Sequence, residues 1–265
     1  MKKSIIFFTI FLFPFLLHSQ AASGSTCIWQ GGSDTNWETP GNWESCNDSG
    51  GSASYPATND VIVKFDGSEA DNSDTNRTIN ISTNIAVNQI IFGGGGSDQN
   101  WIFQGSDLLK TITFSGAKSQ PIRMNRGNVS ATFNINVTVD RSSQSQMVLG
   151  DTGTRANNNI TFGALRTLLI NNGALKFKYN SNTQSVVFNG NISATSNTGD
   201  LIFADYHGAT FGTTVGMSNF PASLLFQGAT VSGEPYGDLN VGAGITVNGP
   251  VQAEQVRLST TDLTV

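Results

Sequence analysis

A short phrase recurs along this chain: two or three apolar or β-branched residues end in Phe, and a Gly follows at once or one residue later. The phrase is found at Phe65, Phe92, Phe103, Phe114, Phe162, Phe188, Phe211 and Phe226. Intervals of 27, 22, 26 and 23 residues separate four successive pairs of these Phe, whereas Phe103 and Phe226 break the register. The spacing indicates a structural repeat of about 24 residues.

The rest of the chain reads as short strands rather than helices. No window of a dozen residues after the first 21 repeats apolar positions at helical spacing, and Gly, Asn or Pro interrupts most windows. The predicted strands are 61–65, 78–82, 86–92, 101–103, 110–114, 131–139, 146–149, 159–162, 167–170, 175–179, 185–188, 201–203, 209–211, 223–226, 239–241, 245–247 and 255–258.

These features predict an all-β fold, specifically a right-handed parallel β-helix over residues 61–265. Each coil of a β-helix adds a layer about 4.8 Å from the last, so one Phe per coil would stack into an interior ladder. The following Gly would supply the positive φ of a corner. A β-sandwich or antiparallel barrel, in which the phrase only marks strand ends, stays open as the alternative.

The first residues predict export. Lys2 and Lys3 precede an apolar run over 5–17, and small residues stand at positions 19 and 21. This is the pattern of a signal peptide over residues 1–21, and the run is shorter than the roughly 20 residues that span a bilayer. We therefore expect an exported protein at the cell surface, in the extracellular space or associated with the outer membrane, with no membrane insertion after cleavage.

Charge and composition narrow the classes of partner. Without Lys2 and Lys3 the chain keeps 12 basic residues against 19 acidic ones, a net charge near −7. Such a chain repels nucleic acid and anionic lipid. With 38% hydrophobic residues but only 12% charged ones, it is expected to be a folded protein kept soluble by neutral Asn, Ser and Thr.

Both Cys and three of the four Trp lie within twenty residues of each other, in a segment that we place at 22–60. In an exported chain, Cys27 and Cys46 are expected to form a disulfide. The favoured interpretation of the segment is a Trp-rich cap over the open end of the β-helix. The competing interpretation is a sugar site in which Trp29, Trp37 and Trp43 stack on sugar rings and Asn36 and Asn42 bind hydroxyls.

The same segment resembles a known N-terminal motif. The elements Trp29-x-Gly-Gly, Asn36-Trp37, Asn42-Trp43, Pro56 and Asp60-Val-Ile are similar to the entry motif of large bacterial surface proteins with autotransporter-type β-helix passengers. The resemblance covers residues 27–65. It implies an exported passenger, although the family's C-terminal translocator barrel is missing and the chain ends in a strand-like run. A truncated reading frame, a translocator encoded elsewhere and a short released protein all stay open.

Residues for catalysis or cofactor binding are sparse, and we expect no catalytic residue, cofactor or metal. His207 reads as a turn residue, and Gly93–Gly96 lacks the Gly-Lys-Ser/Thr of a phosphate loop. The acidic run 66–74 lacks calcium-loop spacing and is expected to be a solvated loop. A polysaccharide lyase or hydrolase would need facing carboxylates with basic residues, for which Arg123, Arg126, Asp140 and Arg141 are a loose cluster at best.

The sequence thus favours a non-enzymatic adhesin or scaffold with an elongated polar wall. Its exposed Asn, Ser and Thr would bind host or matrix glycans or proteins through many weak contacts. The alternative is a carbohydrate-binding or carbohydrate-active β-helix protein.

Overall fold

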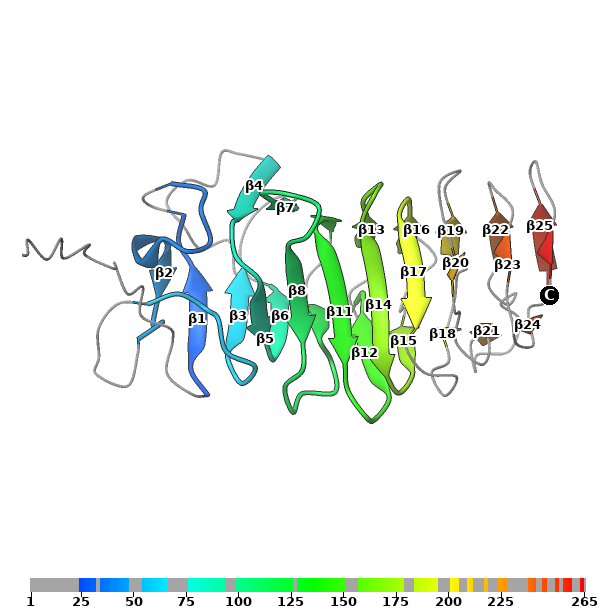
Figure 1. Cartoon of the computed structure of the whole chain (residues 1–265), viewed down its shortest axis with the longest axis horizontal. Coiled ribbons are helices and arrows are strands. Elements are labelled where there is room, and N and C mark those ends of the chain that lie inside the picture. The colour runs from blue at the N-terminus through cyan, green and yellow to red at the C-terminus, as the bar shows by residue number, and fades with distance from the viewer. Residues whose placement is uncertain are drawn as a thin grey trace, which may run out of the picture.

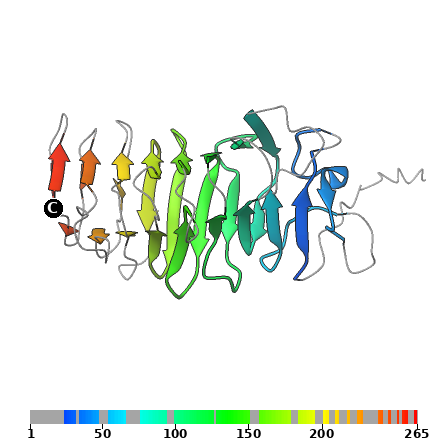
Figure 2. The ribbon, with the colours of Figure 1, turned by 180° about the vertical axis from the view of Figure 1, so that it is seen from behind.

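The computed structural model describes residues 24–31, 34–47, 54–65, 76–93, 99–125, 128–150, 157–178, 184–194 and 201–204. Beyond 204 it describes the strand segments 209–211, 217–218, 224–227, 238–241, 245–246, 251–252, 255–258 and 263–264. In this part of the chain the protein is nearly all β, with one short 3-10 turn, η1 (Pro40–Asn42). Coils stack side by side along one axis, with β1 near one end and the C-terminus at the other (Figures 1 and 2).

Three sheets form the walls of the stack. Sheet 1 has ten strands in the order β2 (Trp43–Glu44), β1 (Thr26–Trp29), β3 (Ile62–Phe65), β6 (Gln89–Phe92), β9 (Ile122–Met124), β12 (Ser145–Val148), β15 (Leu175–Lys178), β18 (Leu201–Ala204), β21 (Leu224–Gln227) and β24 (Val251–Gln252). Sheet 2 has eight, listed from the capped end: β4 (Asn76–Ile81), β7 (Gln99–Gly105), β10 (Val129–Asn134), β13 (Asn159–Phe162), β16 (Ser185–Phe188), β19 (Ala209–Phe211), β22 (Asp238–Val241) and β25 (Gln255–Leu258). Sheet 3 has six: β5 (Ile85–Val87), β8 (Thr111–Phe114), β11 (Asn136–Asp140), β14 (Thr167–Asn172), β17 (Asn191–Ala194) and β20 (Met217–Ser218); β23 (Ile245–Thr246) and β26 (Leu263–Thr264) pair separately.

From β3 to β23 every strand except β20 pairs in parallel with the third strand after it, so one coil takes one strand from each wall. This connectivity is that of a parallel β-helix, as the sequence predicts, and it excludes the sandwich and the antiparallel barrel. Among the described pairings only β1 with β2, in the cap, is antiparallel.

The interior is filled by alternate residues of each strand, and its clearest feature is a Phe ladder in sheet 2. Phe103 stacks on Phe133 with ring centroids 4.9 Å apart, and the stack continues through Phe162 to Phe188 at 5.8 and 5.1 Å. Phe211 continues the register with Phe188. All four stacked rings are nearly or fully buried, so the ladder is a continuous part of the core.

The ladder corrects the repeat deduced from the sequence. Phe103 does not break the register but begins the ladder, and Phe133 belongs to it without a following Gly. Phe65 and Phe92 belong to sheet 1, whereas Phe114 lies in sheet 3 beside Val87 and Val139. A single 24-residue series is therefore wrong: the phrase marks strand ends on all three walls, and the coil length varies.

Two predicted strands are each bent into two by a corner. The runs 86–92 and 131–139 turn at Asn88 and Ile135. Asn88 donates its backbone N–H to the Val61 carbonyl at 2.9 Å, and its side-chain oxygen accepts the Lys118 N–H at 2.8 Å. Ile135 is itself only 1% exposed. Both corner residues are buried, although Asn88 is polar and only Ile135 continues the apolar pattern through its bend.

Candidate binding surfaces

The three Trp of the cap pack on one another and on the first interior ring of the β-helix. Trp37 and Trp43 meet edge to face with centroids 4.8 Å apart, and Trp29 meets Trp43 in the same way at 4.9 Å. All three lie within 6.5 Å of the Phe65 ring. The cluster therefore continues the aromatic core outward from the first coil.

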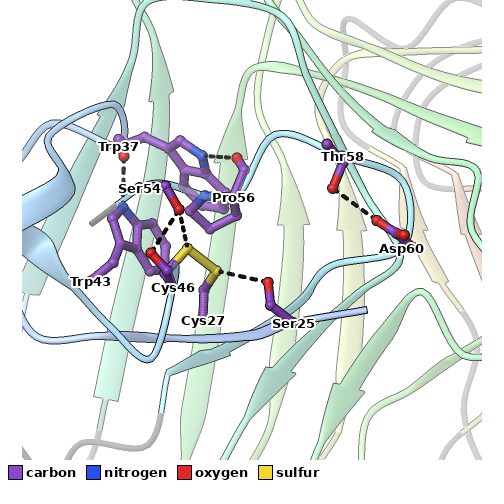
Figure 3. Close-up of a disulfide and its surroundings, with 9 residues drawn as sticks. All are labelled: Ser25, Cys27, Trp37, Trp43, Cys46, Ser54, Pro56, Thr58 and Asp60. Carbon is purple, nitrogen blue, oxygen red and sulfur yellow. Dashed lines mark hydrogen bonds between the residues drawn. A yellow bond between two sulfur atoms is a disulfide. The ribbon is translucent and has the colours of Figure 1, made fainter. Parts of the chain in front are cut away.

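The indoles of Trp37 and Trp43 have their polar atom satisfied inside the cap. The Trp37 indole donates to the Pro56 carbonyl and the Trp43 indole to the Trp37 carbonyl, each at 2.7 Å (Figure 3). A buried indole N–H without a partner would be costly, so these bonds fix the orientation of both rings.

The predicted disulfide joins Cys27 of β1 to Cys46, with Cα atoms 4.4 Å apart. Ser54 donates its hydroxyl to the Cys46 carbonyl at 2.7 Å, so the segment after the disulfide is held from a second side (Figure 3). Both cysteines are buried. The disulfide thus closes the loop that carries Trp37 and Trp43.

The cap is seated on two walls of the helix. β1 extends sheet 1 by pairing with β3, and Asn36 forms a bridge to Asn80 of β4 on sheet 2. Glu38 accepts the backbone N–H groups of Ser82 and Thr83 at 2.7 and 2.8 Å. These bonds satisfy edge groups that the first coil would otherwise expose.

Asp34, which the sequence analysis did not single out, organises the loop between Trp29 and Trp43. Its carboxylate accepts hydrogen bonds from the Asn36 backbone at 2.7 Å, the Asn42 amide at 2.7 Å and the Thr39 hydroxyl at 2.9 Å. Burial raises the pKa of Asp34, but the bonds from Asn36, Asn42 and Thr39 outweigh burial and hold it below the ordinary value. The sequence signal that could have identified Asp34 is an acidic residue at the start of a loop rich in Asn and Thr.

The structure shows how exposed the five residues proposed to bind sugar are. Trp29, Trp37 and Trp43 are 3%, 0% and 7% exposed, so the hypothesis that they are exposed stacking platforms is wrong for this arrangement. Asn42 is fully buried and bonded to Asp34 and to the Asn36 carbonyl. Asn36 alone among the five is exposed, and sugar binding by it stays a prediction.

The outer face of sheet 2 carries rows of neutral polar residues in register. The middle row runs through Thr78, Ile102, Thr132, Thr161 and Val187. A flanking row consists of Asn100, Ser130 and Asn159. Neighbours within a row are about 4.8 Å apart, and the two rows are about 6.6 Å apart. The result is an in-register array of hydroxyl and amide groups, interrupted in the middle row by the aliphatic side chains of Ile102 and Val187.

Sheet 3 carries a second such array. Its outer face presents Thr113, Thr138, Leu169 and Ser193 in one row. Asn136, on the next row, accepts the Thr167 N–H at 2.9 Å and donates to the Leu108 carbonyl at 2.7 Å. Asn136 therefore links neighbouring coils by hydrogen bonds, while the Thr and Ser hydroxyls of the first row lie on the outer face.

The residues considered for a lyase or hydrolase are not brought together. Arg123 lies in β9 of sheet 1, whereas Asp140 ends β11 of sheet 3 and accepts the amides of Asn171 and Asn172 at 2.8 and 2.7 Å. Arg141 donates to the carbonyls of Gly116, Ala117 and Lys118, and burial lowers its pKa. Asp140 and Arg141 therefore hold corners of neighbouring coils.

Several other candidates fall outside the described residues, namely Arg126, His207 and the acidic run 66–74. Within the described part of the chain no group of three or more His, Cys, Asp or Glu is arranged to hold a metal ion. A search of the same part finds no helix with the length and apolar character needed to cross a membrane.

Neither family models, nor curated proteins, nor solved structures contain a significant match to this chain.

Proposed function

We propose that this chain is an exported, non-enzymatic protein of the cell surface or extracellular space, which acts as an adhesin or scaffold through the polar walls of its β-helix. The signal-like N-terminus and the resemblance of residues 27–65 to the entry motif of bacterial surface passengers support export. The observation that carries the binding role is the in-register array of Thr, Asn and Ser on sheets 2 and 3.

The periodicity of this array favours many weak contacts over one strong site. Each hydroxyl or amide alone contributes little to the free energy of binding, because its hydrogen bond to the ligand replaces a hydrogen bond to water. Repetition at about 4.8 Å along a rigid wall makes later contacts effectively intramolecular, so total affinity grows with ligand length. A glycan or an extended protein of a matrix suits such a surface better than a small molecule.

The capped end supports a scaffold role for the Trp segment. Buried indoles and a buried disulfide close the first coil, and that closure protects a sheet edge that would pair with other chains. We assign the segment to stability and the outer walls to binding.

The proposal is tested by binding to a glycan array and to surfaces coated with matrix proteins, first with the wild type. A sheet 2 variant with Thr132→Val and Thr161→Val removes two hydroxyls at nearly constant volume, and a sheet 3 variant with Thr113→Val and Thr138→Val does the same on the other wall. We expect at least one variant to lose most of the multivalent binding while keeping its β-sheet circular dichroism. Full binding by a protein altered on both walls would refute the proposal.

A further inference from the structure

The outer face of sheet 1 differs from the other two walls because it carries cations at a regular spacing. One register row begins at Glu44 of β2 and then runs through Ile28, Lys64, Ile91, Arg123, Val148 and Lys178. From Ile28 onward the row alternates strictly between an aliphatic and a basic residue. We call Lys64, Arg123 and Lys178 the basic row.

Register sets the spacing of this row. Successive members of the basic row are two coils apart, which places their Cα atoms about 9.6 Å from one another. The whole row from Lys64 to Lys178 spans four coil steps, or about 19 Å. Lys176, two residues before Lys178 in β15, lies on the same face and adds a fourth cation beside the end of the row.

The side chains of the basic row lie along the wall rather than standing free in solvent. All three are half-buried, and Val148, between Arg123 and Lys178, is only 6% exposed. Long basic side chains cover aliphatic surface with their stems while their charges stay in water. The row therefore offers three charges in a line with apolar surface between them.

Three cations outside sheet 1 contact other groups of the protein. Lys110 pairs with Asp107 at 3.3 Å, Arg77 lies over the Trp101 ring at 5.0 Å, and Arg141 binds backbone carbonyls. None of these belongs to sheet 1. Without Lys2 and Lys3 the net charge of the chain is near −7, yet the described strands of sheet 1 carry four cations against one carboxylate, Glu44, so the sign of the charge is locally reversed.

We propose that the basic row binds a linear acidic polysaccharide in which every second sugar carries a carboxylate or sulfate. An extended chain of β-linked sugars advances by nearly the same distance per residue as a β-helix does per coil. Acidic sugars would then meet Lys64, Arg123 and Lys178 in turn. The apolar faces of the intervening neutral sugars would cover Ile91 and Val148.

The geometry favours this ligand over other polyanions. Each strand of duplex DNA carries one phosphate per about 3.4 Å of helix axis, so a line of cations at about 9.6 Å leaves most of the phosphates unmatched. Anionic membranes attract clusters of four to eight adjacent basic residues rather than a sparse line. Neither polyanion would make use of the aliphatic positions.

The test measures binding of the disulfide-bonded protein to hyaluronan oligosaccharides, in which glucuronate alternates with a neutral sugar. Affinity is expected to rise with length up to five or six sugars, the length of the row at about 4.8 Å per step, and then to level off. It should fall as salt is raised. Replacing the row by Lys64→Gln, Arg123→Gln and Lys178→Gln should weaken binding by at least about tenfold.

A matched variant removes the same net charge elsewhere, through Arg77→Gln, Lys110→Gln and Lys118→Gln. It should bind like the wild type, as should the charge-preserving Lys64→Arg, Arg123→Lys and Lys178→Arg, while Ile91→Asn should weaken binding. Equal loss in the matched variant, undiminished binding of the row variant, or tighter binding to duplex DNA or to anionic vesicles than to hyaluronan would overturn the proposal.

This inference concerns a different wall from the array proposed for adhesion. Variants of the basic row leave sheets 2 and 3 unchanged, and the Thr→Val variants leave sheet 1 unchanged. Hyaluronan binding lost only in the row variant supports the inference whatever the outcome on the other walls.

Discussion

The indole of Trp43 donates a 2.7 Å hydrogen bond to the backbone carbonyl of Trp37, whose own indole donates to the Pro56 carbonyl at the same distance. This relay links Trp43 and Trp37 to Pro56, which lies 19 residues after Trp37. It connects the disulfide-closed loop to the segment that leads into β3. The cap is therefore one packed unit on the first coil.

Substitution of Trp37 should disrupt this unit. Trp37→Phe leaves the buried Pro56 carbonyl without its donor and should lower the free energy of unfolding by about 1–3 kcal/mol. Trp37→Ala adds a large cavity and should cost about 3–5 kcal/mol. Urea denaturation followed by fluorescence measures both, with Leu109→Ala, at a residue 81% exposed, as a control expected to change stability by less than about 0.5 kcal/mol. A Trp37→Phe protein as stable as the wild type would contradict this role.

Reduction of the Cys27–Cys46 disulfide should loosen the cap before the coils. A closed loop of this length, with a sequence separation of 19, stabilises by about 3 kcal/mol in the chain-entropy model. In a solenoid such a loss acts mainly on neighbouring coils. Hydrogen exchange with and without reductant should show faster exchange in β1 and β3, with protection of β13 and β16 unchanged. Uniform loss of protection along the chain would speak against a local role.

Acid should weaken the loop held by Asp34. Because its folded-state pKa lies below the usual value, the carboxylate contributes stability at pH values above its unfolded pKa of about 4, and this contribution is lost as pH falls through the folded pKa. Asp34→Asn should lower the free energy of unfolding by about 1 kcal/mol at pH 7. The loss is modest because the carboxylate is exposed, so water can replace some of the hydrogen bonds that it accepts. The variant should also lose less stability than the wild type between pH 7 and pH 3. Identical pH profiles in chemical denaturation would rule out this contribution.

Gly116 should not tolerate a side chain. A Cβ at this position would overlap the Asn59 carbonyl oxygen and the Asn88 side chain at the corner of the second coil. Gly116→Ala should therefore lower the melting temperature clearly. Gly93→Ala provides the matched control, because its Cβ would lie 3.3 Å from the Asn125 Cβ and needs only a small shift. Equal melting temperatures for the two variants would contradict the predicted overlap.

Truncation within the Phe ladder should propagate along sheet 2. Phe133 is fully buried between Phe103 and Phe162, so Phe133→Ala leaves a cavity in the middle of the stack and should cost about 3–5 kcal/mol. Phe133→Leu fills part of that space and should cost less. Thermal denaturation followed by circular dichroism ranks the two variants, and the reverse order would show that the ladder does not govern stability here.

The strands were predictable where Gly or Asn separates them, as at β13 and β16, because alternation of apolar and polar residues shows directly in the sequence. Prediction failed at Ile135, because this buried corner continues the apolar pattern through the bend, and at Asn88, because a single Asn within an apolar run was not interpreted as a corner. β9 and β17 were missed because neither ends in the Phe followed by Gly that marks β13 and β16. In the cap, the disulfide followed from counting cysteines, but Asp34 did not, because its bonds reach residues whose positions only the folded loop defines.

The sequence by itself determined that the chain is all-β and repetitive, that it stacks a buried aromatic per coil, and that Cys27 and Cys46 pair, because these depend on local periodicity and on cysteine count. Tertiary structure alone decided which Phe belongs to which wall, that Trp29, Trp37 and Trp43 are turned inward, and that Lys64, Arg123 and Lys178 form one row. Coil length varies from layer to layer, so register across coils is set by strand pairing and cannot be counted along the chain.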